Sequence, residues 1–141
     1  MATEHERTPG RMQAVYFRDR DGREPVREYL AALPPEVREE VVAAVRLLNR
    51  LGPQDPPLPF PFSSQVEGPL RELRCHYGRM LYRILYQRSG NLFILLHALG
   101  KRSARLPAAD KDLAQARWAD FKARMDAADR QPPRAAGRDA P

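Results

Sequence analysis

The chain has one cysteine, Cys75, and only three lysines among its 24 cationic residues. A single cysteine excludes an intramolecular disulfide and a thiolate zinc site, so we expect a reducing cytoplasm as its setting. No apolar run is long enough to span a membrane or follows the charges of the first residues, so we expect a soluble protein that is not exported. The sequence also lacks a Walker loop, a dinucleotide fingerprint, a zinc ligand set and a Ser/His/Asp signature. These absences predict no metal and no cofactor.

Positive charge is concentrated in residues 71–105. This segment contains eight basic side chains and one acid, Glu72, and carries +7, whereas the whole chain carries +6. Arginine predominates, and its planar group donates two hydrogen bonds at once to a phosphate. A high arginine content can also follow from genomic base composition. Composition alone therefore favours a nucleic-acid partner no more than it favours the absence of one.

The length and composition indicate one domain with two loose ends. The 141 residues, 43% of them hydrophobic, suit one core rather than two. We assign the domain to residues 12–130. Residues 1–11 are polar and residues 131–141 are rich in Pro, Gly and Arg, so we expect both tails to be disordered.

Local patterns predict the order β-α-α-β-β-β-α. A strand over residues 13–17 precedes two helices, which begin near Pro25 and after Pro34-Pro35. Prolines force residues 53–69 into an extended path, which we expect to cross the surface with Phe60 and Phe62 as anchors. Three further strands follow, over residues 70–75, 79–87 and 92–99.

The last of these strands is apolar on both faces and should lie centrally. A final helix after Pro107 presents a packing stripe of Ala114, Trp118, Phe121 and Met125. We therefore predict an α+β fold in two layers, with an N-terminal helical hairpin packed on a mainly antiparallel sheet and a C-terminal helix.

A two-residue turn at Tyr77-Gly78 would place Glu72 opposite Arg83 and Arg74 opposite Leu81, all on one face of the sheet. Two interpretations stay open. The two arginines could bind a phosphate, or Glu72 and Arg83 could form a cross-strand ion pair that contributes about 0.2–1 kcal/mol. Lys101, Arg102 and Arg105 follow the last strand and could converge on the same edge.

His97 is the only histidine within an apolar run, and a one-residue change in the preceding turn would reverse its face. A two-residue turn puts it opposite Tyr82 and away from Arg83, which favours a core histidine bonded to a neighbour such as Tyr82 over an acid or base. Cys75 is interpreted as a packing residue rather than a nucleophile.

Six motifs follow one another over residues 13–125: Pro25-Val26-x-x-Tyr29-Leu30, Leu70-Arg71-Glu72-Leu73-Arg74, Tyr82-Arg83-Ile84-Leu85-Tyr86, Leu95-Leu96-His97, Leu99-Gly100-Lys101-Arg102 and Pro107-x-x-Asp110-x-x-x-Ala114. This series resembles the HigB-like, phage-derived toxins of the RelE/ParE superfamily. Lys111 departs from the aliphatic residue that usually opens the family's last helix.

The resemblance implies a RelE-like microbial RNase fold. It also implies the toxin of a type II toxin–antitoxin system, which cleaves mRNA without a metal, in many members at the ribosome, and which a cognate antitoxin neutralises. That antitoxin is expected to be a helix-turn-helix protein. The attacking group would be the ribose 2′-hydroxyl, which needs a proton acceptor and cations around the phosphate.

Site residues follow from the same resemblance. The expected catalytic group is Arg74, Arg83, Lys101 and His97, and the expected RNA-binding cations are Arg71, Arg102 and Arg105. Glu72 is expected to be a structural partner, and no residue stands out as the general base. Two alternatives remain: a ParE-like inhibitor of DNA gyrase with no catalysis, and an inactive prophage-derived nucleic-acid-binding protein.

An antitoxin would bury apolar surface on this protein, and Trp118 and Phe121 are candidate anchors because large aromatics dominate interface energetics. The competing interpretation is that both residues are already used in packing the final helix on the sheet.

Overall fold

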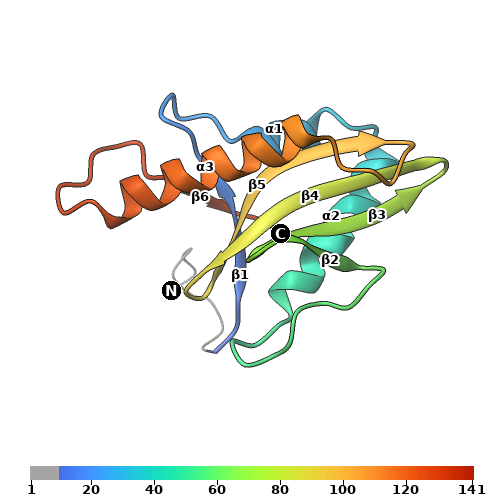
Figure 1. The fold of residues 1–141 in the computed structure, drawn as a ribbon, viewed down its shortest axis with the longest axis horizontal. Helices are drawn as coiled ribbons and strands as arrows, with labels where there is room; N and C mark the ends of the chain where they lie inside the picture. The colour runs from blue at the N-terminus through green and yellow to red at the C-terminus, as the bar shows by residue number, and fades with distance from the viewer. Residues whose placement is uncertain (1–9) are drawn as a thin grey trace.

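The computed structural model describes residues 10–141. Its elements are β1 (Gln13–Phe17), α1 (Pro25–Ala31), α2 (Pro35–Asn49), β2 (Ser63–Glu67), β3 (Leu70–Tyr77), β4 (Met80–Ser89), β5 (Leu92–Lys101), α3 (Ala108–Asp126) and β6 (Ala136–Asp139). One sheet runs in the order β2-β3-β4-β5-β1-β6, and only the β1–β5 pair is parallel (Figure 1). The predicted α+β fold with a mainly antiparallel sheet is therefore confirmed.

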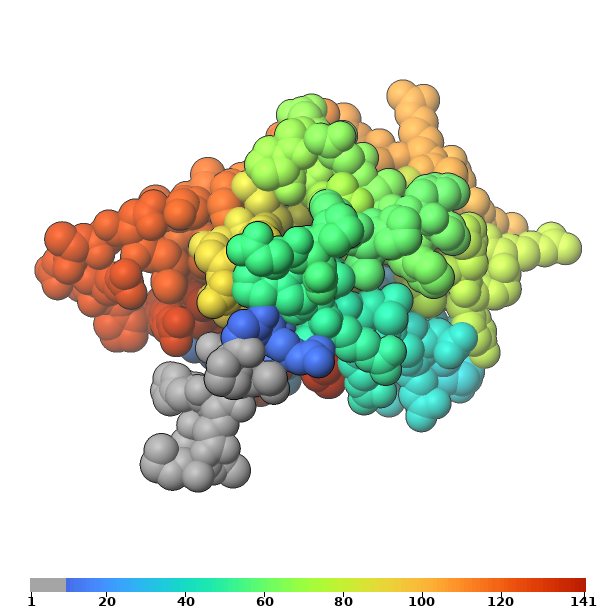
Figure 2. All heavy atoms as spheres, turned by 90° about the horizontal axis from the view of Figure 1, so that it is seen from below, coloured from blue at the N-terminus to red at the C-terminus, as the bar shows by residue number. Residues whose placement is uncertain are grey.

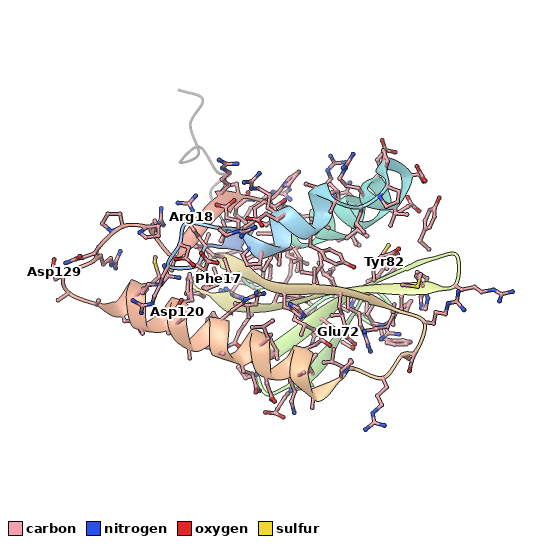
Figure 3. The ribbon with its side chains drawn as sticks, turned by 90° about the horizontal axis from the view of Figure 1, so that it is seen from above. Phe17, Arg18, Glu72, Tyr82, Asp120 and Asp129 are labelled. Atoms are coloured by element: carbon pink, nitrogen blue, oxygen red, sulfur yellow. The ribbon has the colours of Figure 1, made fainter. Side chains whose placement is uncertain are left out.

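The helices cover both faces of the sheet, so the expectation of two layers is wrong. In Figure 3, α1 and α2 lie on one side of the sheet and α3 on the other. The reason lies in β5, where Leu95 packs in the core under α1 and α2 while Leu96 packs in the core under α3, and both are fully buried. A central strand that is apolar on both faces needs cover on both.

Residues 131–141 are not a disordered tail. β6 pairs antiparallel with β1, the Ala140 N–H donates to the Ala14 carbonyl at 2.8 Å, and Ala135, Ala136 and Ala140 are buried. The segment has too little apolar surface to fold alone, but the edge of β1 supplies the backbone partners that composition cannot reveal. The other expected tail is residues 1–11, of which residues 1–9 lie outside the described part of the chain.

A buried carboxylate holds β6 in place. Glu24 is 2% exposed and accepts hydrogen bonds from Arg18 at 2.7 Å, Arg27 at 2.7 Å and the Arg138 N–H at 3.0 Å. Burial alone would raise the pKa of Glu24, but the hydrogen bonds from Arg138, Arg18 and Arg27 outweigh it and lower that pKa. Only glycine fits at Gly137, since a Cβ there would lie 2.7 Å from the Tyr16 backbone carbonyl oxygen and would also clash with the Glu24 carboxylate.

The proline-rich connector differs from expectation at two points. Ser63–Glu67 forms an edge strand, β2, which its polar sequence did not predict. Phe60 and Phe62 are 69% and 51% exposed, so they do not anchor the connector. Arg71 does so instead, because it donates to the Leu58 carbonyl at 3.1 Å and to Ser63 Oγ at 3.3 Å.

The stripe predicted for the last helix is confirmed. Ala114 and Phe121 are fully buried, and Trp118 and Met125 pack partly buried against the same core. Phe121 is thus used in packing and is not an exposed antitoxin anchor. Lys111 pairs with Glu67 at 2.9 Å, which ties the first turn of α3 to the end of β2. None of the helices in residues 10–141 is long and apolar enough to cross a membrane.

Candidate nucleic-acid interface

The hairpin of β3 and β4 brings the candidate residues together. Tyr77 pairs with Met80, so the two turn residues are Gly78 and Arg79, and Gly78 has a φ of 60° that favours glycine. The predicted turn at Tyr77-Gly78 is wrong, and Arg74 lies opposite Arg83 rather than Leu81. Because this register differs by two residues, an even number, each side chain keeps its face.

Glu72 is the centre of the cluster on that face. It is 4% exposed and lies on the α3 side of the sheet, opposite to Tyr82 (Figure 3). Its carboxylate lies 2.7 Å from Arg83 Nε and 3.1 Å from Arg74 Nη1, and it accepts a 2.7 Å hydrogen bond from Ser64 Oγ. Two arginines directly opposite each other would repel, so the buried carboxylate between them is what allows the pair.

Some polar atoms of the cluster have no hydrogen-bond partner among the described residues. These atoms are Arg83 Nη1 and Arg74 Nε, while Arg83 Nε and Glu72 Oε1 meet as an ion pair whose angle does not suit a hydrogen bond. Both side chains are at least 90% buried, with exposed fractions of 4% and 10%. An unmade hydrogen bond at a buried cation is costly, which makes the cluster a candidate anion site.

The remaining predicted cations lie at the end of β5 and in the loop after it, which together are called the cationic loop. Lys101 pairs with Leu81, which lies two residues before Arg83 in β4, so Lys101 and Arg83 are on the same face of the sheet. Lys101, Arg102 and Arg105 are all exposed. They line a hollow of about 570 Å³ with Ser103, Pro107 and Ala108. This loop and the β3–β4 turn project from the same end of the molecule (Figures 1 and 2).

The same loop covers Arg83, whose Nη2 donates to the Ala104 carbonyl. The predicted cations at this end of the sheet therefore differ in access. Lys101 and Arg102 are exposed, Arg74 is at the margin, and Arg83 is enclosed by Glu72 and the loop. Arg71 is separate from this cluster, since it pairs with Tyr86 in register and lies on the opposite face.

His97 lies on the α3 face and not, as the sequence favoured, on the face of Tyr82. A β-bulge between Leu85 and Tyr86 leaves Leu96 as an extra residue, so His97 pairs with Leu85. Its Nε2 lies 2.6 Å from Asp110 Oδ1, and its Nδ1 lies 3.3 Å from Arg117 Nη1. The expected bond to Tyr82 is wrong, and α3 supplies both partners.

Cys75 pairs with Tyr82 and packs against the core under α1 and α2. Burial, followed by the charge of Glu40, raises the pKa of its thiol. A thiol with a raised pKa is a weak nucleophile at neutral pH, which agrees with the interpretation of Cys75 as a packing residue. In residues 10–141, no three His, Cys, Asp or Glu side chains lie close enough to hold a metal ion.

Four contributors were not predicted from the sequence: Ser64, Asp110, Arg117 and the Ala104 carbonyl. Asp110 stands in a motif of the resemblance but received no role, because only α3 docking brings it to His97. The position of Arg71 was available from the sequence, since period-two alternation puts it on the other face from Glu72 and Arg74.

The fold and the site define a class of protein: an α+β domain with a buried carboxylate–arginine cluster beside an exposed cationic loop. Within that class, the family model described as phage-derived protein Gp49-like matches residues 28–119. That span covers more than half of the chain, and the protein belongs to the Gp49-like family. No curated protein matches the sequence.

Proposed function

We propose that the protein is the toxin of a type II toxin–antitoxin system, of the HigB-like branch of the RelE/ParE superfamily, and that it cleaves mRNA at the ribosome without a metal. Membership of the Gp49-like family is compatible with a toxin. The observation that carries the proposal is the group of cations at one end of the sheet, where Lys101 and Arg102 lie beside the Glu72-centred pair Arg74 and Arg83.

In this proposal the ribose 2′-hydroxyl gives its proton to a base and attacks the adjacent phosphate, while the bond from phosphorus to the 5′-oxygen of the next nucleotide breaks. The products are a 2′,3′-cyclic phosphate and a 5′-hydroxyl end, whose oxygen takes up a proton from an acid. The cations stabilise the additional charge of the transition state. Lys101, Arg102 and Arg74 contact the phosphate. Arg83 is a positioning residue, because its contacts with Glu72 and the Ala104 carbonyl fix Arg74 and the cationic loop relative to each other.

His97 is the candidate for proton transfer. It lies on the face of Arg83, and Asp110 at 2.6 Å orients its ring. A histidine whose ring is oriented by a carboxylate is a common general acid or base. Arg117 occupies the other ring nitrogen at 3.3 Å, a long contact that a substrate hydroxyl could displace.

A cognate antitoxin, expected to be a helix-turn-helix protein, is the proposed partner. An acidic segment of that protein would neutralise the exposed residues Lys101, Arg102 and Arg105 and block access to Arg74. The net charge of +7 on residues 71–105 suits such a segment.

One observation favours a second candidate, a ParE-like inhibitor of DNA gyrase that acts by binding alone. Both ring nitrogens of His97 are engaged and Arg83 is enclosed, so an inhibitor would need only the exposed cationic loop. This candidate predicts a change in DNA supercoiling and no new RNA ends.

Induction in bacterial cells distinguishes the two. We expect growth arrest with new mRNA 5′ ends and unchanged supercoiling, and we expect co-expression of the cognate antitoxin to restore growth. The Lys101→Ala/Arg102→Ala variant should lose at least about 100- to 1000-fold in cleavage, because that is the typical effect of removing one transition-state donor and the variant removes two. Arg46→Ala/Arg50→Ala, which removes two exposed charges of α2 and its C-cap, is the control.

Cleavage by the Lys101→Ala/Arg102→Ala variant at the rate of this control would refute the assignment of the site. Growth arrest with altered supercoiling and intact mRNA would refute the nuclease and favour the gyrase inhibitor.

A further inference from the structure

Phe60 and Phe62 are two large aromatic rings on the surface, 69% and 51% exposed. Isolated exposed apolar residues are common, but two rings two residues apart beside a buried cation are a specific arrangement. They belong to the connector before β2, which the space-filling view in Figure 2 shows at the surface.

The backbone that carries these rings is held firmly. The Phe62 carbonyl accepts from the Arg74 N–H at 2.9 Å, and the N–H groups of Phe62 and Ser63 donate to the Pro59 carbonyl at 2.9 and 3.1 Å. Ser63 Oγ shares a buried 2.8 Å hydrogen bond with Tyr86 OH. The rings are thus presented to solvent from a fixed support, and binding to them requires little ordering of the loop.

A cation lies directly against one of the rings. The Arg74 guanidinium is 5.0 Å from the centroid of the Phe60 ring, within the range of a cation–π contact. Arg74 also pairs with Glu72 and retains an unpartnered Nε among the described residues. Phe60 therefore joins an exposed aromatic surface to the cluster assigned above to phosphate.

An aromatic ring beside an arginine is the combination that binds unpaired nucleotides, because bases stack on both kinds of planar group while cations contact the backbone. Duplex RNA cannot use it, since its bases are already stacked. Lys101 lies two strands from Arg74 and two residues along, which is about 10 Å across the sheet and about 7 Å along the strand at the usual spacings. The charge of the surroundings favours RNA over an apolar protein segment.

We propose that Phe60, Phe62 and Arg74 form a stacking platform for unpaired RNA bases, next to the cationic loop that contacts the phosphates. The platform gives the protein a preference for single-stranded RNA. This inference rests on the proposed function in taking RNA as the substrate, but it concerns binding and can be measured without cleavage.

The test uses the full chain and a short single-stranded RNA methylated at its 2′-hydroxyls, so that it cannot be cleaved, with one base replaced by a fluorescent adenine analogue. Stacking quenches the analogue, and titration gives Kd. Phe60→Ala should weaken binding about 5- to 150-fold, equivalent to 1–3 kcal/mol per stacked base, and reduce the quenching. Phe60→Trp should retain both the affinity and the quenching of the unmodified protein. Phe62→Ala should show the same kind of loss as Phe60→Ala.

Controls separate stacking from other effects. Leu113→Ala truncates an exposed apolar side chain on α3, 39% exposed, and should bind as the unmodified protein does. Phe60→Ala should leave the salt dependence and the weaker binding of duplex RNA unchanged, because it removes no charge. Circular dichroism verifies that these surface variants are folded.

An unchanged Kd and unchanged quenching for both Phe60→Ala and Phe62→Ala would overturn the platform. So would an equal loss of single-stranded and duplex binding. If these variants bind RNA normally but lose affinity for the antitoxin, the rings are a protein-docking surface and the inference is wrong. If the unmodified protein never cleaves mRNA in cells but Phe60→Ala still weakens RNA binding, the nuclease is refuted and the stacking platform stands.

Discussion

Replacing Glu72 by glutamine tests how the arginine cluster is held. Glu72 is 4% exposed and is the carboxylate shared by Arg83 at 2.7 Å and Arg74 at 3.1 Å. Glu72→Gln keeps the size of the side chain and one oxygen acceptor but removes the negative charge. Two guanidinium groups that are at least 90% buried then lose their counterion.

The expected loss is about 3–5 kcal/mol, the usual cost of breaking a buried ion pair, compared with 0–1 kcal/mol for an exposed one. A domain of this kind is stabilised by about 5–15 kcal/mol in total, so the variant remains folded in buffer but has lost a large share of its margin. The retained amide oxygen puts the expectation at the lower end, about 3 kcal/mol.

Urea unfolding, followed by circular dichroism and by Trp118 fluorescence, measures the loss. With a slope near 2 kcal/mol/M, the midpoint should fall by about 1.5 M. Glu39→Gln removes an exposed charge on α2 and should change stability by no more than about 0.5 kcal/mol. Glu72→Gln/Arg83→Met should be more stable than Glu72→Gln alone, because an apolar side chain replaces a buried unpaired charge. A loss below 1 kcal/mol in Glu72→Gln would refute the buried cluster and mean that solvent screens both arginines.

Three further outcomes are expected. Deletion of residues 135–141 should cost at least about 1–3 kcal/mol in urea unfolding, because Glu24 loses a hydrogen bond in a buried setting and β1 loses its antiparallel partner; unchanged stability would mean that β6 contributes nothing. The folded-state pKa of Glu24 is lowered, so its contribution is complete above its ordinary value of 4.5 and is lost as pH falls through the folded value. Glu24→Gln should therefore show less additional destabilisation below pH 4.5 than the unmodified protein does, and parallel pH profiles would contradict this. Lys101→Ala/Arg102→Ala should reduce the log–log salt slope of single-stranded RNA binding by about 1.4, at 0.7 per phosphate contact, whereas an unchanged slope would place these cations away from the phosphates.

Register explains why the candidate cluster was predictable although its turn was not. The sequence pattern predicted a turn at Tyr77-Gly78, and the turn lies at Gly78-Arg79. Side chains alternate with a period of two, so this difference moves partners along the strand without changing their face. Glu72, Arg74 and Arg83 therefore meet as expected, although Glu72 lies beside Arg83 diagonally rather than directly opposite.

His97 shows the opposite case. Its face depends on one extra residue in β5, and no local signal in Leu95-Leu96-His97 marks the bulge. A single insertion reverses the face of every later residue in the strand. The partners of His97, Asp110 and Arg117, come from a helix that begins after a separate loop, so only docking of α3 could identify them.

The sequence by itself determined the α+β class, the helices and the central strand, because apolar periodicity and proline positions act locally. Only the tertiary structure decided the burial of Arg83 under the Ala104 carbonyl, the exposure of Phe60 and Phe62, and the addition of β6 to the sheet. Each of these depends on backbone groups or charges far away along the chain. A segment with little apolar surface is ordered when a distant strand edge or carboxylate satisfies its N–H groups, and its own composition carries no record of that partner.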